Sequence, residues 1–163
     1  MYYIKQIKDS DKPWVRKISI KYYGGKFCVF LGRKFFMDKL PGFFAEDENQ
    51  KKLGLTTFEF RNNFCEIMTL NAFKKFNGIG TKLLKKVIKI SKEKKCKKIK
   101  VVTTNDNLDA LRFYQKRGFQ ISKIYKNTSE KDRKIKPSLP KKGDYGILIK
   151  DAIELEYLLN KKS

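Results

Sequence analysis

Two glycines precede a helix-like segment in a part of the chain whose residue types suit anion binding. Gly78 and Gly80 lie in the loop 74–81, which follows a strand-like segment at 65–70. Glycine lets backbone N–H groups approach a ligand closely, and the start of a helix adds unpaired N–H donors and the positive end of its dipole. The spacing predicts a diphosphate site, although a tight turn into an ordinary helix uses the same residues.

Motifs and residue types that the sequence lacks exclude several chemistries. The glycine segment has neither the GxxxxGK[ST] pattern nor the third glycine of the dinucleotide fingerprint. The sequence contains no histidine, so a Ser/His/Asp triad, a Cys/His dyad and a His-ligated metal site are excluded. Any acid or base must be Asp, Glu, Tyr, Lys or Cys. Cys28, Cys65 and Cys96 are too widely spaced for a zinc cage or a CxxC motif, which predicts no metal and a reduced, cytoplasmic setting.

A second motif follows the glycine loop after about 25 residues. It consists of TNDN at 104–107 and ALRFYQKRGF at 110–119. Together with KFNGIG at 75–80, it resembles the GNAT superfamily of acyl-CoA N-acyltransferases. Lys75 stands where that family usually has Gln or Arg, a departure that weakens the fit without abolishing a loop that binds through main-chain donors. The resemblance covers roughly residues 2–125, and 133–155 resembles a bacterial GNAT subgroup of unassigned substrate.

The resemblance implies acetyl-CoA as cosubstrate, a primary amine of unknown identity as acceptor, and direct attack of the amine on the thioester. It implies Tyr114 as the acid that protonates the departing thiolate and Glu66 as the general base. A packed aromatic ring and an ion pair with a lysine are the respective structural alternatives. The implied cofactor contacts are Met68, Thr69, Leu70, Lys75, Phe76, Asn77, Gly78, Ile79, Gly80, Thr81, Asn105, Asn107, Ala110 and Phe113.

The local sequence allows more than one role for Asn105 and Asn107, and it predicts the surroundings of Glu66. Asn105 and Asn107 separate a buried strand from a helix, where an amide caps the helix or contacts a cofactor. Strand alternation places Glu66 on the same face as Phe64, Met68 and, without a bulge, Leu70. A partly apolar surrounding of that kind raises the pKa of a carboxyl group.

The elements that position these residues are those of one α/β (α+β) domain spanning 1–163. We expect strands at 2–7, 27–31, 43–45, 53–60, 64–70, 99–102, 119–125 and 153–159, and helices at 10–22, 79–92 and 108–117. The resemblance implies a mixed, mostly antiparallel sheet whose central strands splay apart, flanked by helices. The polar segment 126–146 predicts a loop or lid, and a C-terminal strand follows it.

The charge of the chain leaves a second function open. With 39 Lys and Arg against 17 Asp and Glu, the net charge is +22. The lysines either form a solvated surface or attract an anionic partner. The alternative to an enzyme is therefore a catalytically weak GNAT-like domain that binds RNA or a ribosomal partner. No segment is apolar enough to predict a membrane partner, and either a monomer or a homodimer is consistent with the sequence.

Overall fold

The computed structural model describes residues 1–75 and 77–160. The strands are β1 (Tyr2–Gln6), β2 (Cys28–Phe30), β3 (Arg33–Phe35), β4 (Gly42–Asp47), β5 (Lys52–Arg61), β6 (Phe64–Ala72), β7 (Lys98–Thr104), β8 (Gln120–Tyr125) and β9 (Ala152–Leu158). The α-helices are α1 (Lys12–Tyr23), α2 (Ile79–Glu93), α3 (Leu108–Gln115) and α4 (Thr128–Ile135). Short 3-10 turns are η1 (Asp9–Asp11), η2 (Met37–Lys39) and η3 (Asp144–Gly146).

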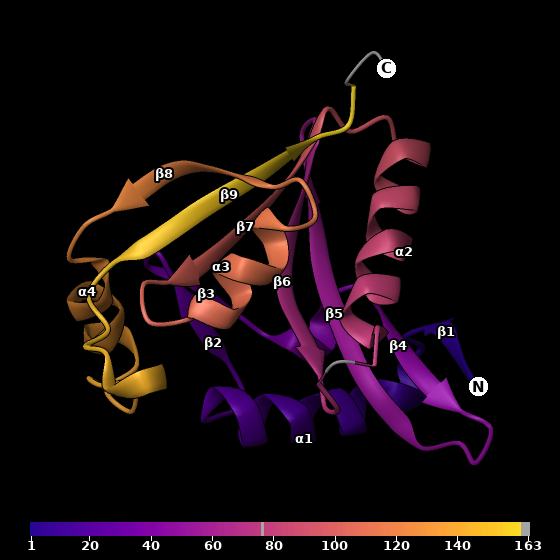
Figure 1. Cartoon of the computed structure of the whole chain (residues 1–163). Coiled ribbons are helices and arrows are strands. Elements are labelled where there is room, and N and C mark those ends of the chain that lie inside the picture. Colours follow the sequence, from indigo (N-terminus) through magenta and orange to yellow (C-terminus); the bar gives the residue numbers. More distant parts are fainter. Residues whose placement is uncertain (76, 161–163) are drawn as a thin grey trace.

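The main sheet is mixed and mostly antiparallel, which confirms the predicted fold class. Its strands lie in the order β1-β4-β5-β6-β7-β9-β8 (Figure 1). The pairing of β6 with β7 is parallel, because α2 carries the chain across the sheet between them, and the other pairings are antiparallel. The hairpin of β2 and β3 forms a separate small sheet.

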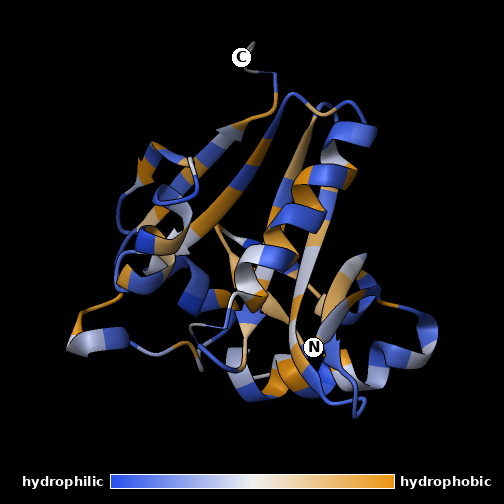
Figure 2. Ribbon diagram, turned by 45° about the vertical axis from the view of Figure 1, so that its right-hand side comes forward, coloured by the Kyte–Doolittle hydropathy of each residue, from blue (hydrophilic) through white to orange (hydrophobic). Residues whose placement is uncertain are grey.

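Helices cover both faces of the main sheet. Leu83, Leu84 and Val87 of α2 are buried in one core with residues of the central strands, and Tyr114 of α3 joins them. Val15 of α1 belongs to a second core beneath the opposite face. Figure 2 shows hydrophobic and hydrophilic positions alternating along α2, as expected for a helix with one buried side and one side rich in lysine.

The two central strands separate at one end of the sheet. Pairing of β6 with β7 ends at Ile67 and Val101, although β6 continues to Ala72 and β7 to Thr104 (Figure 1). Thr57 of β5 pairs with Thr69, whereas the next residue of β5 pairs with Ile67, so Met68 is an extra residue that forms a bulge. The bulge shifts the alternation of β6, and Leu70 packs against the α2 core rather than on the face of Glu66.

The polar segment 126–146 differs from its prediction. It contains α4 and η3 rather than an uninterrupted loop. The helix has little apolar character of its own and is held by tertiary contacts, which explains why the hydrophobic pattern did not reveal it. The predicted strand at 153–159 is confirmed as β9, and the third predicted helix ends at Gln115 rather than at residue 117. None of the helices in the described ranges is both long and apolar enough to span a membrane.

Candidate active site

The glycine loop turns into α2 beside the free edge of β6. Gly78 has a φ of +72° at the residue that precedes the helix, a left-handed conformation that glycine adopts without strain. The backbone oxygen of Asn77 accepts a hydrogen bond from the Tyr2 hydroxyl at 3.2 Å. Since the first turn of a helix has N–H groups without intrahelical partners, the start of α2 offers backbone donors to an anion.

A cleft of about 470 Å³ lies at the start of α2, between the end of β6 and α3. Many residues predicted to contact the cofactor line it: Leu70, Lys75, Asn77, Gly78, Ile79, Gly80, Thr81, Asn107, Ala110 and Phe113, together with Tyr114. The sequence interpretation missed other lining residues: Ala72, Lys74, Asp109, Arg112, Lys116 and Arg117. Five of these, all except Ala72, are adjacent to or within the two motifs, so proximity to a motif was the available signal.

The cleft is strongly basic. Its lining includes five lysine and arginine side chains and a single carboxylate, that of Asp109. This carboxylate already accepts hydrogen bonds from Lys75 at 3.0 Å and from the Tyr145 hydroxyl at 2.8 Å. The hydrogen bond from the Tyr145 hydroxyl, and next the one from Lys75, lower the pKa of Asp109. The hydrogen bond to Asp109 raises the pKa of Lys75. The unbalanced positive charge suits a ligand that carries several phosphates.

Arg117 is held in place by hydrogen bonds to two other residues of this lining. Its Nε and Nη2 atoms donate to the Thr81 hydroxyl at 3.0 and 2.8 Å, and its Nη1 donates to the Phe113 carbonyl at 2.9 Å. The guanidinium lies 3.8 Å from the centre of the Phe113 ring. Within residues 1–75 and 77–160, Arg117 has no acidic partner, so its charge remains available to an anion.

Tyr114 both packs in the core and lines the cleft. Its ring makes edge contacts with Phe113 and Phe119, each at 5.1 Å between ring centres, and the residue is 4% exposed. Burial and the nearby Tyr23 raise its pKa. The phenol therefore keeps its proton at neutral pH, which is the form that can donate a hydrogen bond.

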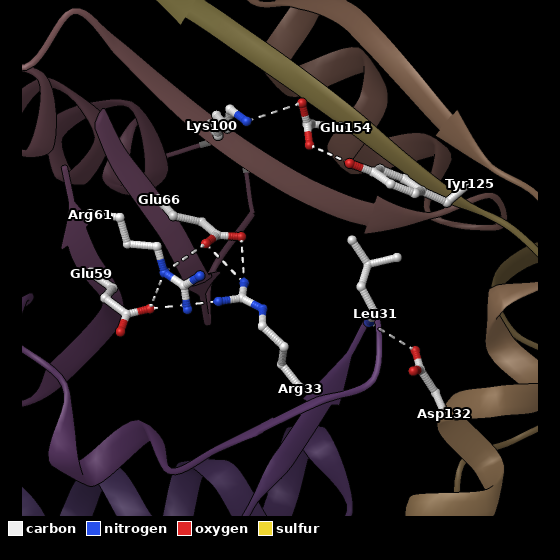
Figure 3. Close-up of polar contacts among 9 residues, drawn as sticks. All are labelled: Leu31, Arg33, Glu59, Arg61, Glu66, Lys100, Tyr125, Asp132 and Glu154. Carbon is white, nitrogen blue, oxygen red and sulfur yellow. Dashed lines mark hydrogen bonds and ion pairs between the residues drawn. The ribbon is translucent and has the colours of Figure 1, made fainter. Parts of the chain in front are cut away.

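Glu66 lies in an ion-pair cluster on the sheet face opposite α2 (Figure 3). Its two carboxylate oxygens accept hydrogen bonds from Nη2 of Arg33 in β3, at 2.8 and 2.9 Å. The guanidinium of Arg61 lies 3.8 Å from the carboxylate. The partner is an arginine from a distant hairpin rather than a lysine, and Glu66 does not line the cleft at α2.

The other predicted contacts lie at varying distances from the cleft. Asn107 lines it, but its side-chain oxygen caps α3 by accepting the Ala110 N–H at 3.1 Å. Asn105 is outside it: its side-chain oxygen accepts the N–H groups of Lys150 and Asp151, at 2.9 and 3.1 Å. Its amide thereby holds the segment before β9. Met68 and Thr69 precede the lining residue Leu70 on β6, and Phe76 lies outside the described residues.

A second cavity of about 430 Å³ lies between the end of α1, β2, the end of β7 and α4. Asn107 lines this cavity as well as the cleft, so the two spaces are neighbours with Asn107 in the wall between them. Tyr23 also lines it, and the Tyr23 hydroxyl donates to the side chain of Asn71, in the part of β6 beyond the bulge, at 2.9 Å. The molecule thus has two adjoining sites, one strongly basic and one with a mixed lining of aromatic, aliphatic and polar side chains.

A sheet with splayed central strands and a basic cleft at a glycine-led helix is the architecture of GNAT acyltransferases. The sequence matches the Acetyltransferase (GNAT) family over residues 3–119. It is 39% identical to the uncharacterized protein YdhI of Bacillus subtilis over 133 residues. This matched region covers 82% of this chain and 83% of the relative. The chain belongs to the GNAT acetyltransferase family.

Solved structures agree with this fold. An IAA acetyltransferase from Bacillus cereus superposes with a TM-score of 0.71 at 21% identity, covering 97% of this chain and 99% of the other. A GNAT family acetyltransferase from Elizabethkingia anophelis with acetyl-CoA bound gives a TM-score of 0.67 at 24% identity, with 96% and 97% covered. At these identities the likeness concerns the fold.

Proposed function

We propose that this protein is an N-acetyltransferase that transfers the acetyl group of acetyl-CoA to a primary amine. The observation that carries the proposal is the basic cleft at the start of α2, next to the stretch of β6 that β7 leaves unpaired. Acetyl-CoA supplies the thioester carbonyl that the amine nitrogen attacks. The acetyl-CoA bound to the Elizabethkingia anophelis relative supports the choice of acyl donor.

The chain fits acetyl-CoA through its own donors. Backbone N–H groups from Gly78 to Thr81 face a diphosphate at the positive end of the α2 dipole. Arg117 adds a charged donor that no carboxylate of the described residues neutralises. The free edge of β6 around Met68 to Leu70 offers main-chain groups to the amide-bearing arm of the donor, as an additional strand would use them.

Tyr114 acts in this proposal as the proton donor to the departing sulfur. Its raised pKa keeps the hydroxyl protonated at neutral pH. Full proton transfer from such a phenol to a thiolate whose thiol has a pKa of about 8.5 is uphill, so a strong hydrogen bond carries much of the stabilisation. Most of the remaining rate enhancement comes from positioning the amine against the thioester.

Glu66 has a structural role in the proposal. A proton taken up by its carboxylate would weaken two hydrogen bonds from Arg33. The pair instead ties the β2–β3 hairpin to β6, and this hairpin forms one wall of the second cavity. The second cavity therefore accommodates the amine, which reaches the cleft at the opening between β6 and β7.

Two measurements test the proposed function. Acetyl-CoA at about 100 times its dissociation constant should stabilise the protein by about 2.7 kcal/mol in thermal or chemical denaturation. A panel of amines should then be screened for release of free CoA thiol. No stabilisation over a wide range of acetyl-CoA concentrations would contradict the proposal, as would amine-independent release of the thiol as the sole reaction.

A further inference from the structure

The second cavity contains two cationic side chains of α4 and the residues after it that lack acidic partners. Arg133 and Lys136 both line the cavity. Lys136 is 4% exposed, and its ammonium donates to the carbonyls of Tyr23 and Phe27 at 2.5 and 2.6 Å. Burial lowers its pKa. An ammonium has three N–H groups, so one donor remains after these two bonds.

Arg133 has a similar surplus of donors. Its Nη2 donates to the carbonyls of Ile149 and Pro140, at 2.7 and 3.3 Å. Its Nε has no hydrogen-bond partner among the described residues but is buried out of reach of a ligand, so the accessible part of the guanidinium is what an anion would meet. Neither Arg133 nor Lys136 lies within 4.0 Å of a carboxylate in the part of the chain that the structure describes. Partly buried cations without a counter-charge are costly, so a ligand that supplies an anion would be favoured here.

The carboxylate in the lining does not meet this need. Asp132 is engaged with the turn between β2 and β3, where its oxygens accept the N–H groups of Gly32 and Leu31 at 2.7 and 3.2 Å (Figure 3). These contacts fasten α4 over the hairpin and leave Arg133 and Lys136 as the charged lining residues without a counter-charge. A polyamine would bring a second ammonium group to this cationic end, and the resulting repulsion disfavours it.

The remainder of the lining sets the shape of the ligand. Tyr22, Phe30 and Leu139 provide apolar surface, and Asn107 lies on the side of the cavity that adjoins the cofactor cleft. A volume of about 430 Å³ suits a small molecule. An acceptor therefore needs an amine, an anionic group that reaches Arg133 and Lys136, and an apolar portion that packs against the aromatic and aliphatic lining.

We propose that the acceptor is a small amine that also carries a carboxylate, such as an apolar amino acid, and that Arg133 and Lys136 bind this carboxylate. The inference rests on the proposed function for the role of the amine, but the preference for an anion follows from the cavity itself. Arg133 and Lys136 are thus assigned as specificity-determining residues.

The test is equilibrium binding by calorimetry, first with CoA alone and then with matched ligands in the presence of CoA. The ligands are phenylalanine, leucine and methionine, their amides, phenethylamine and spermidine. We expect at least one amino acid to bind about tenfold or more tightly than its amide, the effect of a charge-assisted hydrogen bond. Spermidine should bind more weakly than that amino acid. Equal or tighter binding of amides or spermidine, or failure of every amino acid to bind, would overturn the proposal.

Three variants assign the effect to the cavity. Arg133→Gln should abolish most of the preference for the amino acid over its amide, and Arg133→Lys should restore part of it. Lys134→Gln removes an exposed charge from the same helix outside the cavity and should leave the preference intact. Equal losses in Arg133→Gln and Lys134→Gln would refute a specific site. Failure of the protein to bind CoA would instead contradict the proposed function. The preference for the amino acid over its amide can then still be measured in the absence of CoA.

The phosphonate analogue of leucine distinguishes between anions. A carboxylate site should bind leucine at least as well as this analogue. Binding of the phosphonate without binding of leucine would overturn the assignment to a carboxylate.

Discussion

Both carboxylate oxygens of Glu66 accept hydrogen bonds from the guanidinium of Arg33, at 2.8 and 2.9 Å. The carboxylate of Glu66 is largely buried, whereas the Arg33 side chain is 33% exposed. The pair joins β6 to a hairpin that is distant in sequence, so its main effect should be on stability rather than on chemistry.

Glu66→Gln should lower the free energy of unfolding by about 1–3 kcal/mol, because it weakens charge-assisted hydrogen bonds in a partly buried pair. The value of kcat should change by less than about tenfold, since a positioned general base is typically worth more. Arg33→Met breaks the same pair and is the matched variant. A large loss of kcat in Glu66→Gln at normal stability, with activity retained in Arg33→Met, would identify Glu66 as the base.

Tyr114→Phe keeps the ring that packs against Phe113 and Phe119 and removes only the hydroxyl. The value of kcat should fall about 10²–10⁴-fold, as expected for loss of a positioned acid, with little change in acetyl-CoA affinity. An acyl donor with a more acidic thiol should restore part of the rate. Near-normal turnover combined with lower stability would confine Tyr114 to a packing role.

The raised pKa of Tyr114 also sets an expectation for pH dependence. Its hydroxyl donates only while protonated, so deprotonation of Tyr114 should not reduce kcat below about pH 10, the ordinary pKa of a tyrosine. Because the pKa in the folded state lies above that in the unfolded state, the stability linked to Tyr114 is complete below about pH 10 and is lost as the pH rises further. A loss of kcat near pH 8 that disappears in Tyr114→Phe would contradict this assignment.

Gly80 of α2 lies against Phe113 of α3, and a Cβ atom at Gly80 would come within 3.2 Å of the ring. Gly80→Val should therefore destabilise the fold by about 1–3 kcal/mol through overpacking, besides disturbing the cofactor cleft. The loss should be smaller in a Phe113→Leu background, which a double-mutant cycle in urea measures. Equal losses in the two backgrounds would show that the contact does not limit packing.

Arg117→Met should weaken acetyl-CoA binding about tenfold or more, because a charged donor to phosphate is lost. Lys85→Gln removes an exposed charge from α2 outside the cleft and should change the affinity little. Calorimetric titrations of acetyl-CoA into both variants test this difference. Similar affinities of Arg117→Met and the wild type would remove Arg117 from the site, and similar losses in the two variants would indicate a general effect of charge.

The sequence was sufficient for features that depend on local patterns. Gly78 and Gly80 mark the start of α2 because backbone conformation and helix periodicity are local properties, and the residues around them do line the cleft. The bulge at Met68 was not predictable, since it depends on how β5 and β6 pair. It changes the face on which Leu70 lies.

Other features depend on contacts between distant segments. The partner of Glu66 is Arg33, which the hairpin of β2 and β3 brings to β6. The helix α4 has a polar sequence, and Asp132 fastens it to a turn about 100 residues earlier in the chain. The second cavity depends on α4, so its cationic end could not be inferred from the charge of the chain alone.

Transfer of a labelled acetyl group to nitrogen tests the proposed reaction. Acetyl-CoA labelled with carbon-13 in its acetyl group should be incubated with the protein and a pool of amino acids, their amides and polyamines, and the products analysed by mass spectrometry. N-acetyl transfer places the label in an amide bond to the nitrogen of an acceptor, in an amount equal to the free CoA released. Label that remains in the thioester, or that is recovered solely as acetate, would contradict it.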